Sequence, residues 1–136
     1  MNTKRWLLAS AGVLVVIFIL EFVIHQVLLA DVYKATSQVW RSEAEMMSRM
    51  WLFWVGFLIY APVFALIYAK GYEPGKSGVG QGVRYGIYIG LLVGVSMALG
   101  WYVVLPIPSS LAISWAVAGM VESIIAGIVV GFIYRP

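Results

Sequence analysis

Long apolar stretches alternate with short polar segments along the chain. Four of these stretches cover about residues 6–30, 46–69, 82–105 and 110–134. As a helix rising about 1.5 Å per residue, each is long enough to cross about 30 Å of hydrocarbon. The pattern therefore predicts an all-α fold, an integral membrane four-helix bundle.

The segments between these spans are short. The first connection, Asp31–Glu45, is polar and contains Ser42 and Glu45 at the spacing of a capping box, so Ser42 is expected to start a helix. The second, Gly71–Gly80, is rich in glycine and is expected to be a flexible turn. None of the connections can form a soluble domain, so residues 1–136 are expected to be a single transmembrane domain.

The connection between the third and fourth spans is the tightest. Pro106 and Pro108 end one helix, and Ser109 or Ser110 can cap the next. We therefore expect the last two spans to form an antiparallel hairpin.

Small residues recur at every fourth position in these last two spans. The first row is Gly82, Gly86, Gly90 and Gly94, and the second is Gly119, Ser123, Gly127 and Gly131. Residues four apart share a helix face, and small residues let membrane helices approach closely. The pattern favours packing of the two rows against each other, as a glycine-ridged hairpin or glycine zipper. A homo-oligomer interface and a slot for a flat cofactor are the alternatives.

The composition agrees with a protein whose solvent is the lipid bilayer. The chain is 62% hydrophobic and 11% charged, whereas a soluble domain is about half apolar and a quarter charged. The absence of cysteine excludes disulfides and thiolate metal sites. The net charge of +3 comes mainly from basic residues beside the spans, which indicates membrane orientation and argues against a nucleic-acid partner.

The distribution of basic residues predicts the orientation. Six lie on the side of the chain ends, namely Lys4, Arg5, Lys70, Lys76, Arg84 and Arg135, and three lie on the other side, namely Lys34, Arg41 and Arg49. Cytoplasmic segments carry the excess of lysine and arginine. Both termini are therefore expected in the cytoplasm.

Three titratable residues other than tyrosine lie well within the spans: Glu21, His25 and Glu122. Such residues are costly in a membrane, face the protein interior and are functional candidates by default. Glu21 and His25 are four residues apart on one helix face, where they can share a proton or bind an ion. Counted from the outer end, Glu122 is expected to be the deepest and His25 the shallowest.

Three interpretations of these residues remain open. The carboxyl groups can be neutral and hydrogen-bonded, and thus fix the packing of the bundle. They can relay a proton or a small cation. They can also contribute to a metal or cofactor site, although no cofactor is expected: copper would need His25 with Met46 and Met50, and haem would need a second axial ligand from another chain.

The order of segments resembles small four-helix bacterial inner-membrane proteins of uncharacterised function. The strings that carry the resemblance are His25–Tyr33 (HQVLLADVY), Trp40–Met46 (WRSEAEM), Ile67–Gly71 (IYAKG), Gly82–Gly90 (GVRYGIYIG), Trp101–Pro108 (WYVVLPIP) and Gly131–Pro136 (GFIYRP). The resemblance covers nearly the whole chain. It implies the architecture and the bacterial inner membrane, and no activity.

Two functions follow as hypotheses. The favoured one is a structural or accessory subunit of a membrane assembly, in a homo-oligomer or a larger complex. The alternative is a proton or small-cation transporter or channel that uses Glu21, His25 and Glu122. An enzyme is not expected, because no convincing nucleophile or complete set of metal ligands is present.

Overall fold

The computed structural model describes all 136 residues. It is all-helical, with 84% of the chain in helices and no strands. In chain order the elements are α1 (Thr3–Glu21), the π-helix η1 (Phe22–Leu28), α2 (Ala30–Ala35), the 3₁₀-helix η2 (Ser37–Val39), α3 (Glu43–Arg49), α4 (Trp51–Lys70), α5 (Gly78–Ile89), the π-helix η3 (Gly90–Val95), α6 (Ser96–Val104) and α7 (Ser109–Ile133).

Four continuous helical stretches are long and apolar enough to cross a membrane. They are Thr3–Leu28, Trp51–Lys70, Gly78–Val104 and Ser109–Ile133. The prediction of an all-helical chain with four such helices is confirmed.

The helix ends follow from local hydrogen bonding. The capping box predicted at Ser42 and Glu45 is confirmed, and it starts the short helix α3. The second long helix begins at Trp51, later than expected, because the chain turns at Met50 between α3 and α4. The third begins earlier than expected, at Gly78, since the Ser77 hydroxyl accepts a hydrogen bond from the Gly80 N–H.

The predicted serine cap of the last helix is wrong. Pro108 has an extended backbone and is the N-cap of α7, without a side-chain cap. Ser109 and Ser110 are already helical, so their hydroxyls cannot cap the first turn. The Pro108 carbonyl instead accepts hydrogen bonds from Leu111 and Ala112.

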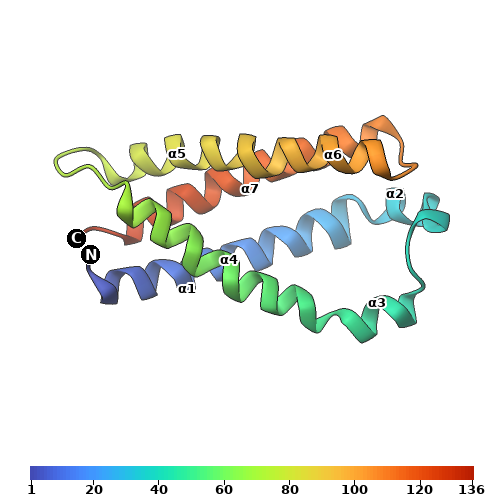
Figure 1. Ribbon diagram of the computed structural model, residues 1–136, viewed down its shortest axis with the longest axis horizontal. Coiled ribbons are helices and arrows are strands. Elements are labelled where there is room, and N and C mark those ends of the chain that lie inside the picture. The colour runs from blue at the N-terminus through green and yellow to red at the C-terminus, as the bar shows by residue number, and fades with distance from the viewer.

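Both chain ends lie at one end of the molecule, together with the connection between α4 and α5, whereas α2, α3 and the α6–α7 turn lie at the other (Figure 1). The continuous stretch of α5, η3 and α6 packs along α7, and α1 packs against both α7 and α4.

Helix α4 packs tightly over only half of its length. Its buried residues, Ala61, Phe64, Ala65 and Tyr68, all lie in its second half. Trp54 lies seven residues before Ala61, hence on the same side of the helix, but is 51% exposed. The first half of α4 therefore diverges from the other long helices, as its path in Figure 1 shows.

Glycines bring α5 and η3 into backbone contact with α7. A Cβ atom added at Gly86 would lie 2.6 Å from Cα of Ile124, and one added at Gly94 would lie 2.8 Å from the carbonyl carbon of Gly119. Neither gap accommodates a side chain. Gly82 and Gly127 meet in the same way, as do Gly78 and Gly131.

Candidate functional site

Glu21 and His25 form a polar pair near the end of the first long helix. The distance between Oε2 of Glu21 and Nε2 of His25 is 3.4 Å, and the two side chains are 29% and 30% exposed. His25 lies in the π-helix η1, where the Leu29 N–H bonds to the Ile24 carbonyl, five residues back. Such one-turn π segments are frequent at functional sites.

The imidazole of His25 continues into a hydrogen-bonded aromatic chain. Its Nδ1 lies 2.6 Å from the hydroxyl oxygen of Tyr33 in α2. The same oxygen accepts a hydrogen bond of 2.8 Å from the indole Nε1 of Trp115 in α7. Because Trp115 can only donate, the Tyr33 proton is available to Nδ1 of His25, which places the imidazole proton on Nε2, toward Glu21.

The environment of Tyr33 favours its neutral form. Burial raises the pKa of its hydroxyl above the ordinary value, the hydrogen bond from Trp115 lowers it in part, and the charge of Glu21 raises it again. Its ring stacks on the imidazole with 5.8 Å between centroids. Trp40 packs edge-on against the other side of this cluster, with its centroid 5.6 Å from that of Tyr33.

Glu122 lies at the same level as Glu21. Gly12 of α1 faces Val129 and Ile133 of α7. The two helices are antiparallel. Glu21 lies nine residues after Gly12, and Glu122 lies seven residues before Val129 and eleven before Ile133. The two glutamates are therefore about equally far along their helices from this contact. The two carboxyl groups interact electrostatically. Glu122 was expected to be deeper than Glu21, but the pairing of the helices brings both to one depth.

One oxygen of Glu122 has no partner. Its Oε1 is buried and accepts no hydrogen bond. The hydroxyl of Tyr60, from α4, lies within electrostatic reach of Glu122 and Glu21 and interacts with Ser123. Three long helices thus contribute to one polar cluster, which we call the carboxylate site and define as Glu21, His25, Tyr60 and Glu122.

Sequence reasoning did not identify Tyr33, Tyr60 or Trp115 as members of this region. Neither Trp115 nor the two tyrosines belong to a periodic pattern that would mark them as partners of the titratable residues. Their membership depends on how three helices pack, which the sequence pattern does not specify.

Neither copper nor haem fits the geometry of His25. Both imidazole nitrogens already have protein partners, Glu21 and Tyr33, so coordination would require breaking one of these contacts. No three His, Asp or Glu side chains lie together as ligands for a metal ion. Met46 and Met50 are 43% and 36% exposed.

The carboxylate site lies between the end of the first long helix, α4 and α7, and the aromatic chain continues from it toward α2. Comparisons of the protein with family models, with curated proteins and with solved structures find no match.

Proposed function

We propose that this chain is a four-helix bundle of a bacterial inner membrane that exchanges protons or small cations at Glu21, His25 and Glu122. The observation that carries the proposal is the position of two carboxyl groups from different helices at one level, with a single imidazole 3.4 Å from one of them, Glu21.

The net charge of these three side chains depends on how many protons they bind. A charged side chain in the middle of a bilayer costs at least about 2.5 kcal/mol on the insertion scale. His25 can supply one positive charge, which compensates one carboxylate. The second carboxylate needs either a proton or an added cation. Binding of a cation therefore displaces a proton from the site, and binding of a proton displaces a cation.

The aromatic chain supplies a route for the proton. Glu21 faces Nε2 of His25, and Nδ1 faces Tyr33. The half-exposed Tyr33 can pass its hydroxyl proton to Nδ1 and take up another from water, while Nε2 releases its proton to Glu21, so a proton crosses the imidazole without rotation of the ring. Because α2 lies at the end opposite the chain termini, this route leads away from the cytoplasm in an N-in, C-in topology.

The glycine-ridged hairpin of α5 and α7 acts as the rigid part of the proposed protein. Backbone contact at Gly86 and Gly94 leaves little freedom for sliding, whereas the first half of α4 has few packing contacts to restrain it. Motion of α4 against the hairpin would open and close the site.

The experiment is proton flux in proteoliposomes that enclose a pH-sensitive dye. Glu122→Gln and Glu21→Gln are each compared with the wild type, with Glu43→Gln as the matched control, because Glu43 is exposed in α3. We expect a flux that the control keeps and both site variants lose while remaining folded. A wild type that conducts neither protons nor monovalent cations under any gradient would contradict the proposal.

A second candidate is a structural or accessory subunit of a membrane assembly. The observation that favours it is the diverging first half of α4, whose inward side is open to another helix. In that case the two glutamine variants change only folding yield and stability, and the protein copurifies with a partner that covers Trp54.

A further inference from the structure

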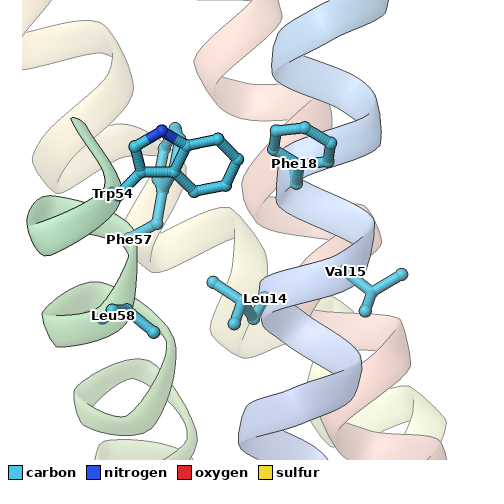
Figure 2. Close-up of a pocket in the computed structure, with 6 residues that line it drawn as sticks. All are labelled: Leu14, Val15, Phe18, Trp54, Phe57 and Leu58. Carbon is cyan, nitrogen blue, oxygen red and sulfur yellow. The ribbon is translucent and has the colours of Figure 1, made fainter. Parts of the chain in front are cut away.

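A lateral groove separates α1 from the diverging half of α4. It has a volume of about 260 Å³ and is lined by six apolar residues, namely Leu14, Val15, Phe18, Trp54, Phe57 and Leu58. Figure 2 shows Phe18 of α1 and Trp54 of α4 at one end of the groove, with Leu14 and Leu58 further along it. The rings of Phe18 and Trp54 stack, with 5.1 Å between centroids.

The groove leads to the carboxylate site. Leu14 and Glu21 are seven residues apart, two turns along nearly the same side of α1, and Phe18 lies between them. On α4, Tyr60 follows Phe57 by three residues and reaches both glutamates electrostatically. An occupant of the groove would therefore have apolar walls along its length and the Glu21 carboxyl group one turn beyond Phe18.

The groove is open to the lipid. Trp54 and Leu58 are 51% and 60% exposed, and Phe18 is 43% exposed. No other helix of the chain covers this side, so a molecule dissolved in the bilayer can enter sideways without crossing the polar connections.

The residues that line the groove favour an organic cation over an inorganic divalent one. Inorganic divalent cations take about six oxygen ligands, but no three acidic or histidine side chains lie together here. An organic cation needs fewer contacts, because aromatic faces attract its charge and apolar walls hold its substituents. Phe18, Trp54 and Phe57 supply such faces.

We propose that the groove and the carboxylate site bind a lipophilic organic cation, a quaternary or protonated amine with apolar substituents. This inference rests on the proposed function and names its substrate class. The bound cation supplies the charge that a proton otherwise supplies, so its arrival releases one proton from Glu122 or Glu21, and its departure takes one up.

The groups that face the site from each packed element are Glu21 and His25 from α1 and η1, Tyr60 from α4, its neighbour Tyr85 from α5, and Glu122 from α7. Tyrosine in water titrates only near pH 10. Below that pH the organic cation therefore competes with protons on the two carboxyl groups.

The test uses tetraphenylphosphonium with the full chain in lipid nanodiscs, following binding by equilibrium dialysis and released protons by a soluble indicator. We expect saturable binding that weakens as pH falls, with about one proton released per cation. Glu122→Gln and Glu21→Gln should each weaken binding by about tenfold or more, whereas Glu43→Gln should not. Neutral triphenylphosphine oxide should release no protons.

A groove variant separates this inference from the proposed function. Leu58→Trp fills the groove and leaves both carboxyl groups in place, so it should lose tetraphenylphosphonium binding while the protein without the cation takes up as many protons as the wild type in a pH titration. Loss of that proton uptake in the folded variant would contradict the separate role of the groove. Equal binding of the neutral compound, or unchanged binding in the double glutamine variant, would show that the groove holds only lipid chains and would overturn the inference. Absence of saturable binding, or a second copy of the chain seated on Trp54 in cross-linking, would overturn it as well.

Discussion

Nδ1 of His25 lies 2.6 Å from the hydroxyl oxygen of Tyr33, although the two residues would be about 12 Å apart along an uninterrupted α-helix. The π-helix η1 and the break at Leu29, which has non-helical backbone angles, bring them together. Trp115 of α7 completes the contact, so the end of the first span, α2 and the last span are joined at one hydroxyl group.

Tyr33→Phe removes that shared hydroxyl and leaves Nδ1 of His25 and Nε1 of Trp115 without a partner. We expect a loss of about 1–2 kcal/mol in the free energy of unfolding, since unpaired polar groups are costly but this region is only half-buried. His25 is the single histidine, so ¹⁵N NMR reports its tautomer without ambiguity, and the variant should lose the preference for the Nε2 proton. An unchanged ¹⁵N spectrum would contradict the hydrogen bond.

The same residue predicts a pH dependence. The pKa of Tyr33 is raised in the folded protein, chiefly by burial. Its contribution to stability is therefore complete below the unfolded value, near pH 10, and is lost as pH rises through the folded value. Between about pH 9 and pH 11 the wild type should lose more stability than Tyr33→Phe. Parallel unfolding curves for the two proteins across that range would exclude this linkage.

The contact between α5 and α7 makes Gly86→Ala strongly destabilising. The added Cβ would lie 2.6 Å from Cα of Ile124, and backbone must shift to admit it, which costs about 2–3 kcal/mol. Gly100→Ala is the matched control, since no atom lies within 4 Å of its added Cβ. The control should gain about 0.5–1 kcal/mol from helix propensity. Unfolding in mixed micelles measures both, and equal stabilities would contradict the close approach of the helices.

How much of this could be predicted from sequence depends on the kind of signal. The four long apolar helices follow from hydrophobic length alone, and the capping box at Ser42 follows from two residues at a fixed spacing. The groups Glu21, His25 and Glu122 could be named because charge is rare in such a composition. Their relative depth could not be predicted, because it depends on the pairing of Gly12 with Val129 and Ile133, which no periodicity encodes.

Other parts depend on departures from regular helix. The hydrogen bond between His25 and Tyr33 exists because η1 widens and the helix breaks at Leu29. Neither η1 nor position 29 contains a glycine or proline that would predict this departure from regular helix. The lateral groove likewise requires α4 to diverge, although the residues of its first half are as apolar as those of its second half.

Gln81 fixes the connection between α4 and α5. Its amide oxygen accepts a hydrogen bond of 2.8 Å from the Glu73 N–H, and its Nε2 donates to the Glu73 carbonyl at 3.0 Å. Gln81→Ala should release residues 71–77 and lower stability by about 1 kcal/mol, because partly buried backbone groups of Glu73 lose their partners. Hydrogen exchange should accelerate at Glu73 and not at α7, and Gln38→Ala, in the exposed 3₁₀ turn, is the control. Unaltered protection of Glu73 would refute this role.

The second half of α4 is held to α5 by tyrosine hydroxyls. Tyr85 donates to the Phe64 carbonyl at 2.8 Å, and Tyr68 donates to the Gly78 carbonyl at 2.8 Å. Tyr85→Phe keeps the ring that packs on Phe64, with 4.7 Å between centroids, and removes only the hydrogen bond.

We expect a loss of about 0.6–1.7 kcal/mol for Tyr85→Phe, the range found for hydrogen bonds between membrane helices. Tyr88→Phe is the matched control, because Tyr88 is 61% exposed on the same helix and should change stability by less than about 0.5 kcal/mol. Because the bond anchors the half of α4 that does not diverge, Tyr85→Phe should also increase the accessibility of a cysteine introduced at Phe57. If that labelling rate stays at the wild-type value while stability falls, the hydroxyl stabilises the fold without restraining α4, and the division of this helix into a fixed and a mobile half is wrong.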